Sequence, residues 1–166
     1  MFEHFFRKNY RSLTLLWCLA LATGAQAQLI ADDPDWRESD TPTPPSFSRD
    51  KLLPLEMPPY VTLQFGIDPA TLSISPDGIV RYVVVTSNSS GSVSAFYEGI
   101  RCAKGEVKVY ARAGGSGSWT LVARPEWRAL SSNQPSRHAV IFARQAACTG
   151  AAAASSTDDI VRAMKK

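Results

Sequence analysis

The feature that most constrains this chain is a series of short segments, rich in β-branched and aromatic residues, that follow one another with only three or four residues between them. The clearest are residues 79–87 (IVRYVVVTS), 92–102 (SVSAFYEGIRC) and 106–113 (EVKVYARA). Parallel neighbours need crossover connections of about a dozen residues or more, and these turns are far shorter. The sequence therefore predicts an antiparallel meander.

Further short strands are expected on both sides of this series. Residues 60–67 (YVTLQFGI) alternate as a half-buried strand does, and residues 119–123 and 127–130 resemble short strands. Residues 137–148 (RHAVIFARQAAC) are rich in alanine and lack glycine and proline, which favours a helix. We therefore expect an α+β, mostly β fold: an antiparallel meander sheet of about five to seven short strands with one C-terminal helix packed on one face.

The first 27 residues have the organisation of a secretory signal peptide. Arg7, Lys8 and Arg11 precede an apolar run (LTLLWCLALATG), which is followed by an A-x-A site that ends at Ala27. The run is too short to span about 30 Å of hydrocarbon, and the three parts together predict export and cleavage after Ala27. We therefore expect a periplasmic or secreted protein with no transmembrane segment in its mature form.

Removal of residues 1–27 leaves a chain with little net charge. Three basic residues and one acidic residue leave with that segment, so the formal charge falls from +3 to +1. A nearly neutral chain gives no strong electrostatic case for binding nucleic acid. We therefore expect no nucleic-acid partner.

The mature chain divides by composition into three parts. Residues 28–59 are rich in proline and predict an extended or partly disordered arm; the sequence leaves open whether this arm docks onto the domain. Residues 60–148 form the β-rich folded domain. Residues 149–166 predict a flexible tail with a short candidate helix near its end.

Cysteine usage predicts one cross-link. Cys18 leaves with the signal peptide, so Cys102 and Cys148 remain. In an oxidising compartment two cysteines most simply form one intramolecular disulfide. Free thiols and a metal pair are the alternatives, but a four-ligand zinc site is disfavoured because His138 is the only histidine of the mature chain. We expect no metal and no cofactor.

The expected disulfide assigns the two faces of the sheet. Glu98 and Cys102 share one face of their strand because side chains alternate, and the segment that ends at Cys148 must cover that face. If the turn lies at residues 88–91, Arg81 stands directly opposite Glu98. A carboxylate on a covered face needs a partner, so we predict a buried Arg81–Glu98 ion pair.

The next hairpin has two alternative registers. A two-residue loop at Lys104–Gly105 places Val107 and Val109 on the face of Cys102, whereas a three-residue loop places Glu106 and Lys108 there. A slip of one residue exchanges the whole set. We favour the first alternative because it buries the valines under the helix.

The opposite face then carries aromatic rings interleaved with cationic groups. Such a face can stack on bases or sugars and grip acidic groups; the plainer interpretation is that tyrosines simply cover the far side of a sheet. The candidate binding face consists of Tyr82, Tyr97, Arg101, Lys108, Tyr110 and Arg112.

The sequence assigns no catalytic residue. It has no G-x-S-x-G elbow, no phosphate-binding loop and no C-x-x-C pair. Glu98 is a candidate because it is expected to be desolvated, and His138 because the pKa of a histidine lies near neutrality. A structural ion pair is the favoured interpretation of Glu98.

Two stretches carry a family resemblance: DGIVRYVVV at residues 77–85 and YEGIRCAKGEVKVYA at residues 97–111, followed by later tryptophans and the closing Cys148. Over residues 58–148 the chain resembles the CNP-one-like family of uncharacterised exported proteins of Gram-negative bacteria, and it departs from the family pattern at Ala147. The resemblance implies a periplasmic or envelope location. It supplies no established reaction and no functional residue.

These observations favour a non-enzymatic binding or structural module of the periplasm or cell envelope, with an envelope protein or glycan as a candidate partner. The alternative is a hydrolase that acts on an envelope polymer through Glu98 or His138. Structure discriminates between the two. A sealed Arg81–Glu98 pair disfavours the enzyme, and a Glu98 that opens into a concave pocket with His138 favours it.

Overall fold

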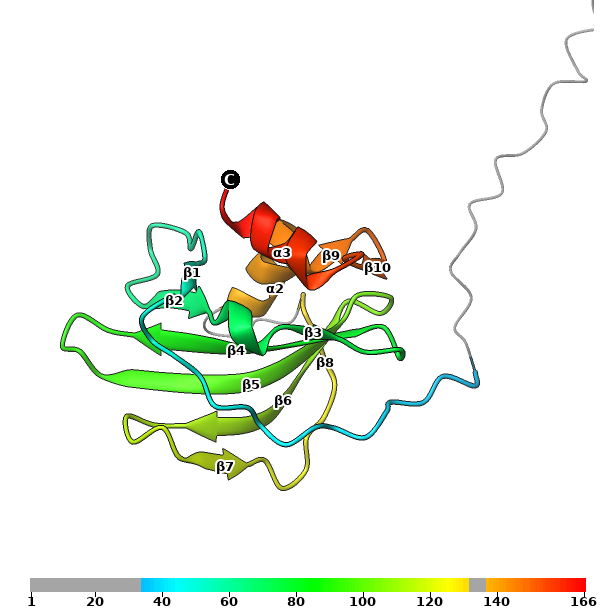
Figure 1. The fold of residues 1–166 in the computed structure, drawn as a ribbon, viewed down its shortest axis with the longest axis horizontal. Helices are drawn as coiled ribbons and strands as arrows, with labels where there is room; N and C mark the ends of the chain where they lie inside the picture. The colour runs from blue at the N-terminus through cyan, green and yellow to red at the C-terminus, as the bar shows by residue number, and fades with distance from the viewer. Residues whose placement is uncertain (1–33, 132–136) are drawn as a thin grey trace, which may run out of the picture. The chain divides into compact units, whose positions relative to one another are not determined.

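The computed structural model describes residues 34–131 and 137–166, and the predicted signal peptide lies outside them. Its body is an antiparallel sheet of eight strands (Figure 1). The strands are β1 (Leu53–Pro54), β2 (Gln64–Ile67), β3 (Ser73–Ile74), β4 (Ile79–Ser87), β5 (Val93–Arg101), β6 (Glu106–Ala113), β7 (Trp119–Leu121) and β8 (Arg128–Ala129). Their order is β1-β2-β4-β5-β6-β7, with β3 beside β4 and β8 beside β6.

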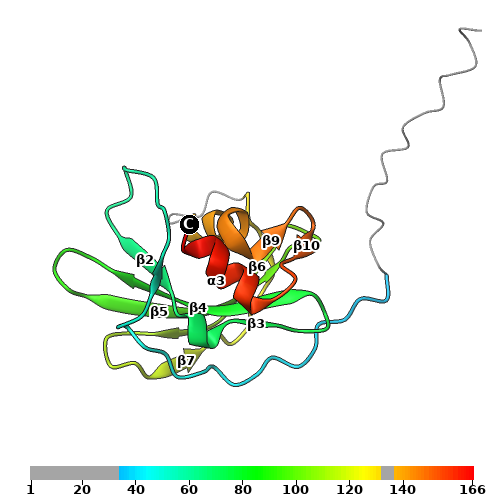
Figure 2. The same ribbon diagram turned by 45° about the horizontal axis from the view of Figure 1, so that its top comes forward.

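The helical elements follow β8 in the chain. α2 (His138–Phe142) continues directly into η2 (Ala143–Ala147), a π-helical turn. A small hairpin of β9 (Cys148–Thr149) and β10 (Ala152–Ala153) then leads to α3 (Thr157–Met164), and η1 (Pro69–Thr71) is a 3-10 turn after β2. α2 and α3 lie on the same side of the sheet in both views (Figures 1 and 2).

The predicted fold class is confirmed: the protein is mostly β, antiparallel, with helices at its C-terminal end. The sheet has eight strands rather than five to seven because β1, a two-residue pairing in the proline-rich segment, is too short to leave a periodic signal in the sequence. Residues 149–166, expected as a flexible tail with a short helix near its end, include the second residue of β9, all of β10 and the docked helix α3. The hydroxyl of Ser156 caps α3 by accepting a hydrogen bond from the Asp159 amide at 3.1 Å, and Ile160 is completely buried.

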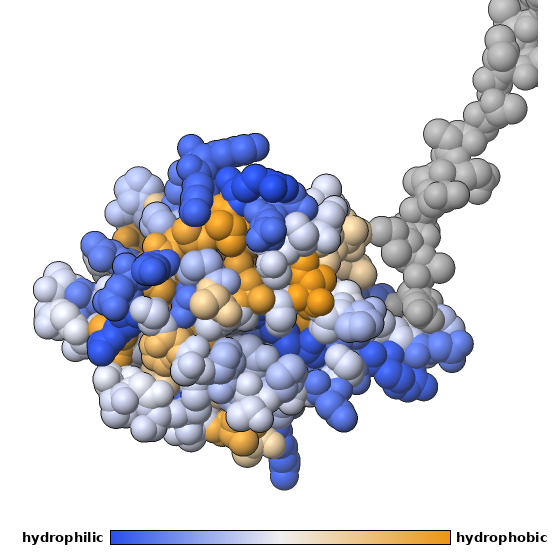
Figure 3. All heavy atoms as spheres, in the orientation of Figure 1, coloured by the Kyte–Doolittle hydropathy of each residue, from blue (hydrophilic) through white to orange (hydrophobic). Residues whose placement is uncertain are grey.

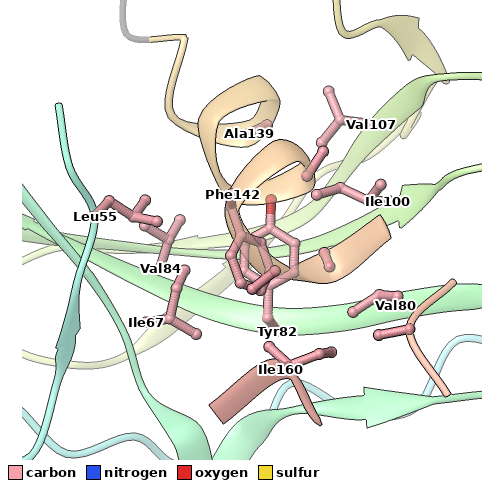
Figure 4. Close-up of a cluster of buried hydrophobic side chains, with 14 of the residues drawn as sticks. Leu55, Ile67, Val80, Tyr82, Val84, Ile100, Val107, Ala139, Phe142 and Ile160 are labelled. Carbon is pink, nitrogen blue, oxygen red and sulfur yellow. The ribbon is translucent and has the colours of Figure 1, made fainter. Parts of the chain in front are cut away.

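The main core lies between the sheet and these helices, on what we call the helix face (Figure 4). The ring of Tyr82 packs edge-on against Phe142 of α2, with centroids 4.6 Å apart. The strand side chains of the helix face include Val80, Tyr82, Val84, Thr86, Phe96, Glu98, Ile100, Val107 and Val109. On the face that Figure 3 shows, apolar side chains gather in patches that hydrophilic side chains surround.

The proline-rich arm is docked, which answers the question that the sequence left open. Residues 34–52, which we call the strap, run along the sheet on the side away from α3 (Figures 1 and 2). Trp36 Nε1 donates to the carbonyl of Asp77 at 2.8 Å, and Phe47 packs against Trp119 with centroids 5.4 Å apart. This strap face has its own apolar cluster: Val83, Val85, Ala95, Tyr97, Tyr110, Ala111 and Ala113.

The register of β4 against β5 differs by one residue from the prediction. Ser87 pairs with Val93 rather than with Ser92, so the loop has five residues. The side chain of Asn88 holds this wider loop, because its Oδ1 accepts hydrogen bonds from the amides of Ser90 at 3.1 Å and Ser92 at 2.9 Å.

This slip makes the predicted Arg81–Glu98 ion pair wrong. Tyr82, not Arg81, stands opposite Glu98, and Arg81 stands opposite Gly99 on the strap face. A one-residue shift moves a strand's side chains to the other face of its partner. The two charges therefore lie on opposite sides of the sheet.

For the next hairpin, the favoured assignment of side chains to the two faces of the sheet is confirmed. Val107 pairs with Ile100 and Val109 with Glu98, so both valines lie on the helix face. The connecting loop comprises residues 102–105 and is two residues longer than predicted. An even change in loop length preserves the faces.

A β-bulge in the same hairpin turns one predicted side chain around. Glu98 pairs with Val109 but Tyr97 pairs with Ala111, so Tyr110 is the additional residue. Beyond the bulge Arg112 stands opposite Phe96, on the helix face. The candidate binding face is therefore wrong as a shared surface, because Tyr82 and Arg112 leave it while Tyr97, Arg101 and Tyr110 stay.

Candidate functional site

The strap covers the aromatic and cationic groups that remain on the strap face. Glu38 of the strap accepts hydrogen bonds from Tyr110 Oη at 2.8 Å and Trp127 Nε1 at 3.1 Å, and it forms an ion pair with Lys108. The guanidinium of Arg101 lies 3.5 Å from the centroid of the Trp36 ring. The stacking and ion pairing predicted for an external ligand are thus made by the chain's own N-terminal segment.

Arg81 is the most deeply buried charge on this side, with 1% of its surface exposed. Its Nη2 lies 3.2 Å from Asp77 Oδ2 and 3.8 Å from Glu38 Oε1. Burial alone would raise the pKa of Asp77, but hydrogen bonds from Ser39 and Ser75 and from two backbone amides outweigh it and hold that pKa well below its usual range. The strap and the sheet are therefore joined by an ionised, hydrogen-bonded network.

Gly99 makes room for this network. A Cβ atom at this position would lie 2.8 Å from Tyr110 Oη and 2.9 Å from a methyl carbon of Ile79. Both distances are too short for a real side chain, so the close approach of Tyr110 requires glycine here.

On the helix face, Glu98 meets His138 and Tyr82. His138 Nε2 lies 2.9 Å from Glu98 Oε2 and 3.1 Å from Oε1, and Tyr82 Oη donates to Oε2 at 2.8 Å. All three residues are buried, with exposed fractions of 2% for Glu98, 6% for His138 and 0% for Tyr82. The structure thus joins the two residues that the sequence named separately as catalytic candidates.

Two phenyl rings flank the imidazole of His138. The ring of Phe65 is stacked on it at 5.1 Å between centroids, and that of Phe96 at 6.3 Å. Burial would lower the pKa of His138, but the charge of Glu98 and the hydrogen bond to it act the other way, and the pKa is raised. The imidazole of this pair therefore holds its proton more firmly than a free histidine does.

A pocket of about 410 Å³ opens above this pair. Glu98 and His138 both line it, and its remaining polar lining consists of Thr86, Arg112, Arg124, Glu126 and Arg128. Its apolar lining includes Leu63, Phe65, Phe96, Val107, Val109 and Val122. The three arginines, which we call the rim arginines, are exposed, and they come from β6, the segment after β7, and β8.

Thr86 is the unsatisfied polar group of the pocket. Its side chain is 8% exposed, and its Oγ1 has no hydrogen-bond partner among the described residues. Buried hydroxyl groups are normally paired with protein or water. The pocket therefore offers a ligand one buried hydroxyl.

The predicted Cys102–Cys148 disulfide is confirmed, with the two Cα atoms 5.7 Å apart. It joins the residue after β5 to the residue after η2, and so holds the α2–η2 segment, with His138 at its start, over the helix face. Within residues 34–131 and 137–166 no cluster of His, Cys, Asp and Glu is suited to hold a metal ion. In the same ranges no helix is both long and apolar enough to cross a membrane.

Sequence reasoning identified Glu98 and His138 but missed what surrounds them. Tyr82 and Arg112 were placed on the wrong face, and Thr86, Arg124 and Arg128 were not singled out. The capping side chain of Asn88 was a signal for the wider loop, and that loop alone corrects the partner of Glu98.

The comparisons with known proteins give one result. Residues 31–165 match the model of the CNP1-like family, so the match includes the strap and α3 as well as the sheet. No curated protein and no solved structure matches the chain. The chain belongs to the CNP1-like family.

Proposed function

We propose that this protein is an exported, non-enzymatic binding module of the periplasm or cell envelope whose ligand occupies the pocket on the helix face. The charged, apolar and A-x-A parts of residues 1–27 support export. The Cys102–Cys148 disulfide supports it too, because such bonds persist in oxidising compartments.

The pocket carries the binding proposal. Its volume of about 410 Å³ lies within the range of small-molecule sites, and it combines apolar walls with a few convergent polar groups, as such sites do. The disulfide and the buried Glu98–His138 pair fix its floor. A ligand thus meets a preformed surface.

The chemistry of the floor favours binding over catalysis. Both carboxylate oxygens of Glu98 and the Nε2 of His138 are already engaged with each other and with Tyr82. The described lining residues include no serine or cysteine, and the hydroxyl of Thr86 has no hydrogen-bonded base to activate it.

Native mass spectrometry of the protein isolated from the periplasm of its own cells tests this proposal. The wild type is expected to carry a bound small molecule. Val109→Trp, which fills the pocket, is expected to lose it, and Leu121→Trp, on an exposed side chain outside the pocket, is expected to keep it. Equal masses of adduct, or none, on all three proteins contradict the proposal. Circular dichroism checks that each variant is folded.

A hydrolase is the second candidate, because Glu98 does open into a concave pocket together with His138. Isolated envelope polymer incubated with the protein distinguishes the two. Release of soluble fragments by the wild type, abolished by His138→Gln, favours the hydrolase and contradicts the non-enzymatic role.

A further inference from the structure

We propose that the ligand of the helix-face pocket is a single-chain amphipathic anion, a carboxylate or a phosphate monoester, whose charged group binds the rim arginines and whose apolar body lies in the pocket. This inference rests on the proposed function and names the chemical class of its ligand. Four features of the pocket support it.

The first feature is the excess of positive charge. The lining carries Arg112, Arg124 and Arg128 against Glu98 and Glu126, and Glu98 is already paired with His138 at 2.9 Å. Three guanidinium groups therefore face one uncompensated carboxylate. Guanidinium groups bind carboxylates and phosphates through parallel hydrogen bonds.

The second feature is that the rim arginines are free to bind. Among the described residues, none of their guanidinium groups has a hydrogen bond, an ion pair or a ring contact. The arginines of the strap face differ, since Arg81 is paired with Asp77 and Arg101 is stacked on Trp36. On the strap face the arginines are paired or stacked within the chain, whereas on the helix face the rim arginines remain available to a ligand.

The third feature is the β-bulge at Tyr110. Without that additional residue Arg112 would lie on the strap face with Lys108, since the two are an even number of residues apart. The bulge interrupts the ladder between the long strands β5 and β6 and turns Arg112 toward the pocket. Bulges of this kind commonly re-aim a side chain beside a functional site.

The fourth feature is Thr86, the buried hydroxyl without a partner. It is the polar group that a bound anion or its ester oxygen would satisfy. The walls beside it are apolar, with Phe65 and Phe96 on the strands and Leu63 38% exposed. An inorganic ion would leave the apolar walls of the pocket exposed to water. A neutral apolar molecule would make no ion pair with the rim arginines.

Calorimetric titration of the full mature chain, with its disulfide oxidised, tests the class of ligand. The probes are decanoate, decyl phosphate, decanol, decyltrimethylammonium and inorganic phosphate, each below its aggregation threshold. Decanoate or decyl phosphate is expected to bind at least about tenfold more tightly than decanol. The two anions together show whether the head group is a carboxylate or a phosphate.

Variants connect the binding to the named residues. Arg112→Gln, and separately Arg124→Gln with Arg128→Gln, are expected to weaken anion binding about tenfold and to reduce its salt dependence. Arg144→Gln, an exposed arginine of η2 outside the pocket, is the matched control and is expected to leave binding unchanged. Weakening by Arg144→Gln as large as that by Arg112→Gln overturns the assignment to the rim.

Thr86→Val separates ligand binding from structure. It removes an unpartnered buried hydroxyl at nearly constant shape, so the variant is expected to be at least as stable as the wild type yet to bind the anion several-fold more weakly. Thr86→Ser, which restores the hydroxyl, is expected to recover binding. Unchanged affinity in Thr86→Val excludes Thr86 from the ligand site.

The failures of the two proposals differ. Binding of decanol or of the cationic probe as tightly as of the anions overturns the anionic class and leaves the pocket as a binding site. Binding of no probe also overturns it. The proposed function fails instead if protein from the periplasm carries no molecule that Val109→Trp removes, or if the wild type releases soluble fragments from envelope polymer and His138→Gln does not.

Discussion

The two faces of the sheet contain similar side chains used in opposite ways. On the strap face, Arg81 and Lys108 are paired with Asp77 and Glu38. On the helix face, the guanidinium group of Arg112 stands open above a pocket. The strap covers the charged groups of the strap face, whereas the pocket on the helix face stays open. Charge therefore stabilises the fold on one side and is available to a ligand on the other.

The largest expected effect on stability tests the disulfide that holds the α2–η2 segment over the helix face. Cys102→Ser with Cys148→Ser is expected to lower the free energy of unfolding by about 4 kcal/mol, because the unfolded chain loses a closed loop, here between residues 46 positions apart. Denaturant unfolding measures this loss. Reduction of the wild type is the control and should produce the same destabilisation; a loss below about 1 kcal/mol contradicts the prediction.

The next effect tests the strap. Glu38→Ala removes the acceptor of Tyr110 and Trp127 and the partner of Lys108, so it is expected to destabilise the protein by about 3 kcal/mol. Asp40→Ala, at an exposed carboxylate two residues along the strap, is the control and is expected to cost less than about 0.5 kcal/mol. Anion binding in the pocket should survive Glu38→Ala. Similar losses from both variants would show that the strap is held without Glu38.

A smaller effect tests the pair on the pocket floor through pH. The pKa of His138 is raised in the folded protein above its ordinary value of 6.5, so the folded state retains the proton more firmly than the unfolded state. The stability gained from protonation is complete below about pH 6.5 and is lost as the pH rises through the raised pKa. Unfolding free energies measured between pH 6 and pH 9 should therefore fall for the wild type.

The control for this experiment is His138→Gln. His138 is the only histidine after His4 in the chain. The variant's free energy of unfolding should therefore depend less on pH over the same range. Identical slopes for the two proteins would disprove a protonated pair at Glu98.

The smallest expected effect on stability gives the most direct comparison between the arginines of the two faces. Arg124→Ala with Arg128→Ala should change the free energy of unfolding by no more than about 0.5 kcal/mol per site, because both side chains are exposed and unpaired among the described residues. Arg81→Ala, on the other face, should cost several times more because it leaves Asp77 buried without its cation. Equal losses would mean that the rim arginines are structural.

The sequence was sufficient for those features that depend on alternation and on covalent chemistry. Short turns predicted the antiparallel meander, and the cysteine count predicted the bond between Cys102 and Cys148. The even spacing of Val107 and Val109 placed both valines on the correct face, even though the loop before them is longer than expected, since faces depend only on parity.

The features that the sequence did not predict depend on single additional residues. Each such residue moves the side chains that follow it to the other face of the sheet. Asn88 widens one loop by one residue and so separates Arg81 from Glu98. The bulge at Tyr110 adds one residue without the glycine that would mark it. The docking of the strap was also not predicted, because its hydrogen bonds and ion pair join Glu38 to residues 70 to 89 positions later in the chain.

That separation has a consequence for how the molecule folds. The strap precedes the sheet in the chain, yet Glu38 can settle only after both Lys108 and Trp127 are in place. The first described segment to be synthesised is thus among the last to find its position, and contacts between such distant residues form slowly. Until then the apolar side chains beneath it, among them Tyr97 and Ala111, stay in water. A newly made chain would therefore pass through a stage in which the sheet has formed but its strap face is still exposed to water.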